Sequence, residues 1–249
     1  MLRFLGLLTA NSGVVFLLAL VMLQACGTTT QQTKHVNASY TKIWINGKAI
    51  NLGGDLTFKN LVILEEALQT LQKHAPKSVR SINSINFINN ADHFPYNQRA
   101  HAFFDDICLY EGSTFYPDGS VTHVEIDLET IWHEVAHAYT YILGYRFLDE
   151  WIAIAGNVYQ GERYGFYRED YEEKIIAGVV SAYGLMNEKE DVAEWVEEIY
   201  SYNRGLGSVF NDPKRIDKSD PRFLKKLELL YKKEFISREI YEKIKPLLR

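Results

Sequence analysis

His133-Glu134-Val135-Ala136-His137 is the stretch of this sequence that carries the most chemical information. Residues four apart share one face of a helix, so the imidazoles of His133 and His137 can reach a single metal ion. Zinc favours such nitrogen donors, and a catalytic zinc has three protein ligands and one open coordination position. The carboxylate of Glu134 can then hold a water molecule against the metal. The motif therefore predicts a zinc site whose third ligand comes from elsewhere in the chain.

The residues around this motif favour a helix that begins after Asp127. Asp127 is a good N-cap, and Glu129 suits the positive end of the helix dipole. Apolar residues then recur at helical spacing, at Leu128, Ile131, Val135, Ala138 and Ile142. The alternative is a helix that carries two surface histidines. It fits less well, because residues 132–143 are too apolar for a solvated helix and buried polar groups need partners.

A second motif lies downstream, in Ser181-Ala-Tyr183-Gly184-Leu-Met-Asn187-Glu188-Lys-Glu190-Asp191-Val-Ala193-Glu194-Trp195. Asn187 can cap a helix that carries Glu190 and Glu194 on one face. We expect Glu190 to be the third zinc ligand. Glu194, one turn later, is then placed to accept the far N–H of a ligand histidine, as acidic groups around zinc sites often do. The alternative is a capping box, in which the Glu190 side chain bonds back to the Asn187 backbone N–H.

Three other acids compete for the third ligand position. Asp191 is turned about 100° from Glu190 on a helix and so cannot share the metal-facing side. Asp149 and Glu150 follow His137 by 12 and 13 residues. They directly precede the apolar run 151–155, which we expect them to cap. Glu190 therefore remains the preferred ligand.

Taken together, the two motifs resemble the anthrax lethal factor-like zinc metallopeptidase family. This group of glutamate-zincin endopeptidases also includes bacterial proline-specific endopeptidases. The matching pattern is His133-Glu134-x-x-His137 followed by Tyr183-Gly184-x-x-Asn187-Glu188-x-Glu190-x-x-Ala193-Glu194. The resemblance covers residues 120–235 and is strong at both motifs. Between them, residues 145–177 are longer and more charged than the family pattern, so we expect a loop that shapes the substrate site to differ.

The resemblance implies a role for each matching position. One Zn²⁺ per chain would be held by His133, His137 and Glu190. Glu134 would be the general base that takes a proton from the zinc-activated water and delivers it to the leaving amine. The Tyr183 hydroxyl would help to hold the negative charge of the tetrahedral intermediate. Glu194 would take the acidic position beside a ligand histidine.

The start of the chain resembles a bacterial lipoprotein signal. Residues 4–25 contain no charged side chain, follow Arg3 and lead into Leu23-Gln24-Ala25-Cys26, which is typical of an export signal with a lipobox. The resemblance implies a signal peptide over 1–25, a lipid on Cys26, a polar tether over 26–40 and a metallopeptidase-like domain over 41–249. The alternative is a retained transmembrane anchor, for which roughly 20 apolar residues suffice.

Both a cleaved lipoprotein signal and a retained transmembrane anchor are expected to place the domain outside the cytoplasm. Gly27 stands where a retention-type aspartate would follow the lipidated cysteine. By similarity to Gram-negative lipoproteins, this implies the outer membrane or cell surface and not the inner membrane. Loss of Arg3 with the signal changes the net charge from −5 to −6, which argues against nucleic acid as a partner. The pairs Lys225-Lys226 and Lys232-Lys233 are expected on solvated helix faces. Membrane contact is therefore expected through the lipid at Cys26 alone.

The order of the remaining patterns predicts an α+β fold. Strands are expected over 41–45, 82–88, 103–110 and 120–126, with a hairpin turn at Asn46-Gly47, another turn over 115–119 and a helix over 58–74. Two closing helices are expected after Asp220 and after Ser237. We expect a small mixed sheet packed on the zinc helix, followed by a mainly helical half that brings Glu190. The strand 120–126 is the predicted edge that holds a substrate peptide in extended form.

These patterns predict a zinc-dependent endopeptidase, anchored as a lipoprotein, that hydrolyses an extracytoplasmic protein or peptide. The alternative from a different class is a non-catalytic surface lipoprotein that uses the same fold to bind a protein partner. A third possibility is a zinc hydrolase that acts on peptidoglycan stem peptides. It shares the chemistry and differs only in substrate.

Overall fold

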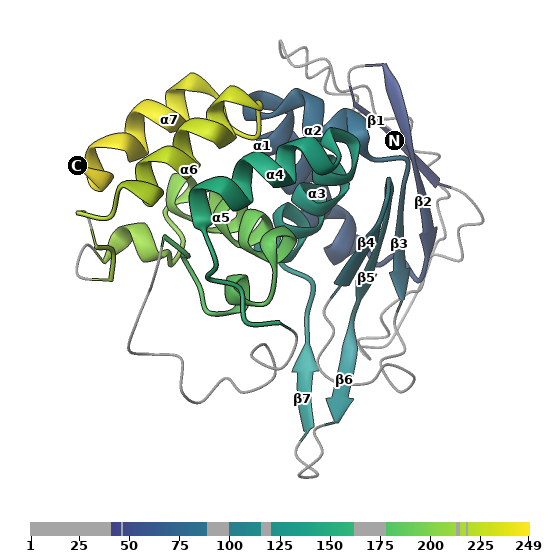
Figure 1. Cartoon of the computed structure of the whole chain (residues 1–249). Coiled ribbons are helices and arrows are strands. Elements are labelled where there is room, and N and C mark those ends of the chain that lie inside the picture. Colours follow the sequence, from purple (N-terminus) through teal and green to yellow (C-terminus); the bar gives the residue numbers. More distant parts are fainter. Residues whose placement is uncertain are drawn as a thin grey trace, which may run out of the picture.

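The computed structural model describes residues 41–45, 47–88, 100–115, 121–161, 178–212, 215–217 and 219–249. The predicted signal peptide, Cys26 and the tether lie outside these ranges. The described residues form a five-stranded mixed sheet, a two-stranded sheet and seven α-helices, which confirms the predicted α+β class (Figure 1). No helix in this part of the chain is long and apolar enough to cross a membrane.

The five-stranded sheet has the order β1-β2-β3-β5-β4. Its strands are β1 (Thr41–Ile45), β2 (Lys48–Gly54), β3 (Ser84–Ile88), β4 (Ala100–Phe103) and β5 (Asp106–Tyr110). β1 and β4 are antiparallel to their neighbours, whereas β2, β3 and β5 run parallel. The predicted hairpin joins β1 to β2, with Ile45 opposite Lys48 and Gly47 at a φ of 79°. A residue with positive φ at this point suits the tight turn.

Helices α1 (Phe58–His74) and α2 (Pro76–Ser81) connect β2 to the parallel strand β3. α1 has the predicted bounds because Thr57 caps it, with its side-chain oxygen accepting the Asn60 N–H at 3.1 Å. Its leucines at helical spacing, Leu64, Leu68 and Leu71, are buried. The helices gather on one side of the five-stranded sheet, so this side forms the core (Figure 1).

One predicted strand is wrong in detail. The run 103–110 is not a single strand, because the chain reverses at Phe104-Asp105 and pairs β4 with β5, Phe103 opposite Asp106. Phe104 has a φ of 56°, a conformation that a bulky residue seldom adopts. Large apolar residues stand on both sides of this turn, so the sequence pattern is the same as that of one continuous strand.

The predicted strand 120–126 is β7 (Val121–Val124), which pairs with β6 (Gly112–Phe115) in the separate two-stranded sheet. This hairpin extends away from the rest of the molecule (Figure 1). Phe115 ends β6, and the remainder of the predicted turn, 116–119, lies outside the described residues.

Helix α3 (Leu128–Leu143) carries the first motif and begins as predicted, with the Asp127 side chain accepting the Thr130 N–H at 2.8 Å. It contacts β4 and β5 on one side and α5 (Glu188–Arg204) on another. α4 (Tyr145–Ala155) follows after Gly144. The expectation that Asp149 and Glu150 cap a segment at 151 is therefore wrong, since both residues lie inside α4.

The closing helices are α6 (Pro221–Lys232) and α7 (Arg238–Ile244), capped as predicted by Asp220 and Ser237. Short 3-10 helices complete the fold: η3 (Tyr183–Leu185), η4 (Val209–Asn211) and η5 (Lys245–Leu248). The expected solvated position of Lys226 is wrong, because its side chain is fully buried. An ammonium group is rarely buried without a charged partner, and the partner here is Asp191.

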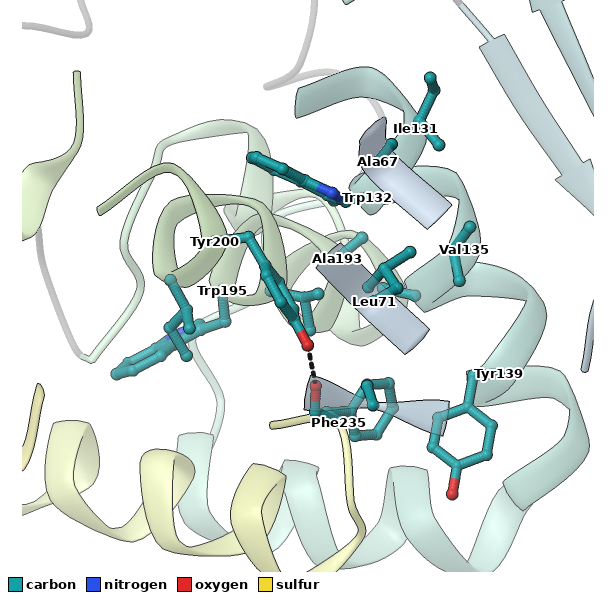
Figure 2. Packing of buried hydrophobic residues seen from close by; sticks show 14 of the residues in the cluster. Ala67, Leu71, Ile131, Trp132, Val135, Tyr139, Ala193, Trp195, Tyr200 and Phe235 are labelled. Atoms are coloured by element: carbon teal, nitrogen blue, oxygen red, sulfur yellow. Dashed lines mark hydrogen bonds between the residues drawn. The ribbon is translucent and has the colours of Figure 1, made fainter. Parts of the chain in front are cut away.

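Aromatic and aliphatic side chains of α3 and α5 pack together in one buried cluster (Figure 2). Trp132 of α3 and Tyr200 of α5 are fully buried, with ring centroids 5.5 Å apart. The Tyr200 hydroxyl donates to the Phe235 carbonyl at 3.0 Å, and the ring of Phe235 packs edge-on against Tyr139 of α3. Close packing of this kind resists small shifts, so it fixes the relative position of the two helices that carry the motifs.

Candidate metal centre

Two helices supply the predicted ligands. His133 and His137 project from one face of α3, with ring centroids 4.8 Å apart. Glu190 lies in the first turn of α5, whose start is fixed by the Asn187 side chain. Its Oδ1 accepts the backbone N–H groups of Lys189 and Glu190 at 2.9 and 3.0 Å. The predicted cap at Asn187 is thus confirmed. It fixes the first residue of α5 and therefore the position of Glu190 in the first turn of the helix.

The three predicted ligands converge on one point. Glu190 Oε2 lies 3.1 Å from His133 Nε2 and 3.2 Å from His137 Nε2, and the two Nε2 atoms are 3.1 Å apart. The Glu190 carboxylate is therefore directed at the two imidazoles. This position favours the ligand prediction over the capping box, in which the same carboxylate would turn back to Asn187.

The donor set and its spacing fit zinc. Donor atoms around a tetrahedral zinc, with bonds of about 2.0–2.1 Å, lie roughly 3.3 Å from one another. The three observed separations are 3.1, 3.1 and 3.2 Å. Two imidazole nitrogens and one carboxylate oxygen are also the donors of one known class of catalytic zinc site. The three donors are therefore spaced as a metal site requires, and their chemistry suits zinc.

Two further carboxylates face the other nitrogen of His133. Glu194 Oε1 and Glu197 Oε2 lie 3.2 and 3.1 Å from Nδ1. An acceptor at Nδ1 holds the proton there and leaves the Nε2 lone pair for a metal. The structure thus brings Glu194 to the predicted position. Glu197 was missed, although its place three residues after Glu194, on the same helix face, could have suggested it.

His133, Glu194 and Glu197 also form a second group whose donor atoms lie within 4.8 Å of one another. This group would use Nδ1 of His133, whereas the group with His137 and Glu190 uses Nε2. The first group presents two nitrogen donors and the second presents one. Since zinc favours nitrogen donors, the first group is the better candidate for a metal site, and the carboxylates of the second are suited to orient His133.

The charges around the imidazoles favour a cation. Burial disfavours protonated His133, but hydrogen bonds to Glu190, Glu194 and Glu197 outweigh it and raise the pKa of His133 well above its usual value. Burial likewise opposes ionisation of Glu190, yet hydrogen bonds from His133 and His137 lower its pKa overall. Burial and the charge of Glu194 raise the pKa of Glu197 to about 7. The site therefore stabilises positive charge between its imidazoles and carboxylates.

Glu134 is buried, with 5% of its surface exposed. Among the residues that the structure describes, its Oε2 is one of few buried side-chain oxygens without a hydrogen-bond partner. Burial raises the pKa of Glu134, and the neighbouring His137 and His133 oppose this shift. A buried, unpaired carboxylate oxygen of raised basicity beside the ligands is suited to accept a proton.

Tyr183 lies in η3, and its ring centroid is 6.1 Å from that of His133. The residue is 41% exposed, so a ligand in the site can reach it. Burial of the hydroxyl, followed by the charge of Glu190, raises the pKa of Tyr183. The hydroxyl therefore stays protonated and can donate a hydrogen bond.

The structure brings together six predicted residues from three elements: His133, Glu134, His137, Tyr183, Glu190 and Glu194. The rival Asp191 points elsewhere and pairs with Lys226, while Glu150 pairs with Lys233 at 2.8 Å. The predicted lipidation site, Cys26, lies outside the described residues. No protein-family model, curated protein or solved structure matches this chain.

Proposed function

We propose that this chain is a zinc-dependent endopeptidase, related to the anthrax lethal factor-like metallopeptidases, that hydrolyses peptide bonds in an extracytoplasmic protein or peptide. The observation that carries this proposal is the convergence of two imidazole nitrogens and the Glu190 oxygen within 3.2 Å, next to the unpaired Oε2 of Glu134. The proposal includes a lipid anchor at Cys26, which the sequence pattern supports.

Each neighbouring side chain has a distinct task in this reaction. Bound zinc would lower the pKa of a water molecule and polarise the substrate carbonyl. Glu134 takes the proton of the attacking water and passes it to the leaving amine. The Tyr183 hydroxyl donates to the oxygen on which negative charge develops. Glu194 and Glu197 hold the Nδ1 proton of His133 and so keep its ring in place.

The proposed site lies between a sheet packed on α3 and a helical part that supplies Glu190. An extended substrate can add to a strand by main-chain hydrogen bonds. β7 remains the predicted strand for this purpose, since it directly precedes α3. β4 is a second possibility, because it is the terminal strand of the five-stranded sheet and contacts α3. A bound peptide that touched only the helical part would contradict both assignments.

Zinc content is the first test of the function. The purified chain, passed through gel filtration without chelator, is expected to contain about one zinc per chain, as a three-ligand catalytic site requires. A strong chelator should abolish hydrolysis of a peptide library, and added zinc should restore it. A chain that takes up no zinc when zinc is supplied would contradict the proposal. That outcome would favour the non-catalytic lipoprotein that binds a protein partner, as would stoichiometric zinc without turnover.

Substitution of Tyr183 by Phe should reduce kcat by about 10²-fold or more, because one donor to the developing oxyanion is lost. The zinc content should not change, since the hydroxyl is not one of the three converging donors. Steady-state kinetics and elemental analysis on the same samples check both statements. Tyr145→Phe is the matched control, because Tyr145 is 83% exposed at the start of α4. An unchanged kcat in Tyr183→Phe would remove Tyr183 from the mechanism.

A further inference from the structure

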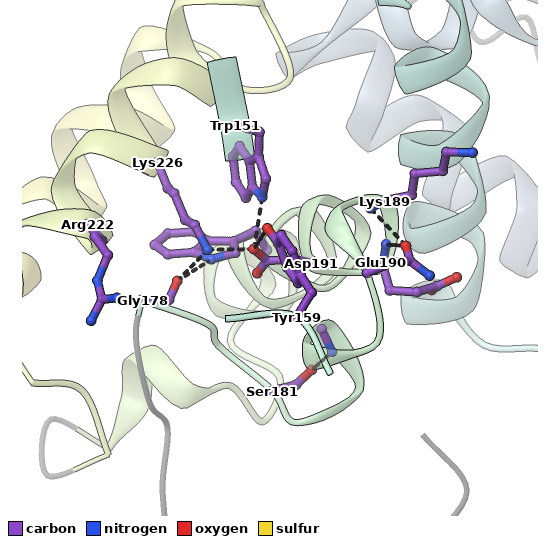
Figure 3. A network of polar contacts seen from close by, with 12 residues as sticks. Trp151, Tyr159, Gly178, Ser181, Lys189, Glu190, Asp191, Arg222 and Lys226 are labelled. Carbon is purple, nitrogen blue, oxygen red and sulfur yellow. Dashed lines mark hydrogen bonds and ion pairs between the residues drawn. The ribbon is translucent and has the colours of Figure 1, made fainter. Parts of the chain in front are cut away.

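A buried polar network surrounds Asp191, the residue that follows Glu190 on α5 (Figure 3). Asp191 and Lys226 form an ion pair whose two side chains are both fully buried. The same Asp191 oxygen accepts the Trp151 indole N–H and the Tyr159 hydroxyl, each at 2.8 Å. Lys226 also donates to the Gly178 carbonyl at 2.9 Å. The network thus joins α4, α5, α6 and the chain around 159 and 178.

Asp191 and Glu190 are consecutive residues of α5 with different surroundings. A step of one residue turns the side chain by about 100° around the helix, so the two carboxylates cannot face the same way. The Glu190 carboxylate contacts His133 and His137. Asp191 faces the buried network, and its side chain points in a different direction from that of Glu190 (Figure 3). Holding Asp191 therefore fixes the rotation of the first turn of α5, and with it the direction of the Glu190 carboxylate.

The network also reaches the loop that carries Tyr183. Next to Tyr159, the backbone N–H of Gln160 donates to the Leu185 carbonyl at 2.8 Å, and that of Gly161 donates to the Met186 carbonyl at 3.2 Å. Leu185 belongs to the same 3-10 turn as Tyr183, and Met186 ends it. The Tyr159 hydroxyl thus connects Asp191 to the backbone that holds this turn.

A second contact between the network and η3 runs through Gly184. A Cβ at this position would lie 2.9 Å from Val179 Cγ1 and 3.2 Å from the Asp191 Cα. These separations are too short for an ordinary contact, and one of them is to backbone. The absence of a side chain at Gly184 lets the turn with Tyr183 rest directly on α5 beside Asp191.

A gain in folding stability does not by itself explain why this ion pair is buried. Removing two charges from water is costly, and replacement of a buried pair by apolar residues of similar size is often neutral or stabilising. Asp191 and Lys226 sit among large apolar side chains, including Trp151 and Trp195, where such a replacement could pack. Directional hydrogen bonds, in contrast, can only be supplied by polar groups.

We propose that Asp191, held by Lys226, Trp151 and Tyr159, is a positioning residue for both Glu190 and Tyr183. The proposal rests on the proposed function, which gives Glu190 and Tyr183 their roles. It adds that one buried carboxylate aligns a metal ligand and an oxyanion donor supplied by different segments. The network itself touches neither substrate nor metal in this scheme.

The first test compares two hydroxyl deletions. Tyr159→Phe removes the connection to Asp191, whereas Tyr200→Phe removes another buried hydroxyl that bonds the Phe235 carbonyl. Only Tyr159→Phe should speed amide exchange at Gln160 and Gly161, by about fivefold, the factor for one lost hydrogen bond. It should also lower kcat roughly 10-fold with little change in KM, as small misplacements do. Equal exchange and equal kcat in the two variants would overturn the proposal.

The second test removes both charges in two ways. Asp191→Asn with Lys226→Met keeps an acceptor for Trp151 and Tyr159, and Asp191→Leu with Lys226→Met does not. We expect both double variants to fold, the Leu variant with a lower melting temperature because the Trp151 and Tyr159 donors lose their acceptor. Only the Leu variant should lose about tenfold in zinc affinity and change its Co²⁺ absorption spectrum, both measured well below its melting temperature. Wild-type affinity and spectrum in both variants would overturn the proposal.

The two proposals fail in different ways. A wild-type chain that neither binds zinc nor cleaves peptides would contradict the proposed function. The exchange rates at Gln160 and Gly161 need no metal and no substrate, so they still decide whether the Tyr159 hydroxyl holds the turn of Tyr183. Unchanged rates in Tyr159→Phe would then reject the positioning network, and faster rates would support it.

Discussion

Substitution of Glu134 by Gln should abolish peptide hydrolysis and leave zinc bound. Gln has nearly the same size and shape, but its amide cannot take a proton from the attacking water. The loss of a general base costs roughly 10²–10⁴-fold in rate. We expect the upper end here because the Glu134 Oε2 atom is buried and has no hydrogen-bond partner, so it is available to the attacking water. The three converging donors belong to other residues, so metal affinity should not depend on Glu134.

Hydrolysis of a peptide library and elemental analysis on the same preparation check this prediction. Glu242→Gln is the matched control, because Glu242 lies exposed on α7 and should tolerate the change without effect on rate or zinc. A Glu134→Gln chain that still turned over peptide would require another base. One that lost zinc would instead assign Glu134 to the metal and not to proton transfer.

Substitution of Glu190 by Ala should lower zinc affinity by more than about 100-fold, beyond the usual cost of losing an outer partner of a ligand. The change removes one of three donors and leaves His133 and His137 as a two-nitrogen site. Competition with a chelator of known affinity measures the loss. Hydrolysis should fall with the metal and return in part when zinc is added in excess.

Glu194→Ala is the informative comparison for Glu190. It removes one of the two carboxylates at His133 Nδ1, and Glu197 remains there at 3.1 Å. Its effect on zinc affinity should therefore be smaller, about 10-fold. The predicted order is a large loss for Glu190→Ala, a modest loss for Glu194→Ala and none for Glu134→Gln. Equal zinc retention in the Glu190 and Glu134 variants would count against Glu190 as a ligand.

Local patterns were sufficient to predict much of the fold. A helix over 58–74 was predicted from the helical spacing of Leu61, Leu64, Leu68 and Leu71, and α1 has the same first and last residues. The start of α3 followed from Asp127, and that of α5 from Asn187. These signals lie within one helical turn of the feature that they predict, so a single sequence carries them.

Features that depend on distant partners could not be predicted in this way. Lys226 resembled a solvated residue because its partner Asp191 lies 35 positions earlier in the chain. The reversal at Phe104 was hidden because apolar residues stand on both sides of it. Glu197 shares the face of Glu190 and Glu194, but its contact with His133 depends on how α3 packs against α5. Tertiary packing decides each of these, and short windows of sequence do not report it.

The separation of the ligands along the chain has a consequence during biosynthesis. Glu190 follows His137 by 53 residues and His133 by 57, and the contact depends on the core that joins α3 to α5. A nascent chain that has emerged only through α4 already carries both histidines but lacks the carboxylate and Tyr183. Such a chain has no complete catalytic apparatus. On the proposed function, the ribosome and the export machinery would thus handle a latent protease, which becomes competent only when its second half has folded onto the first.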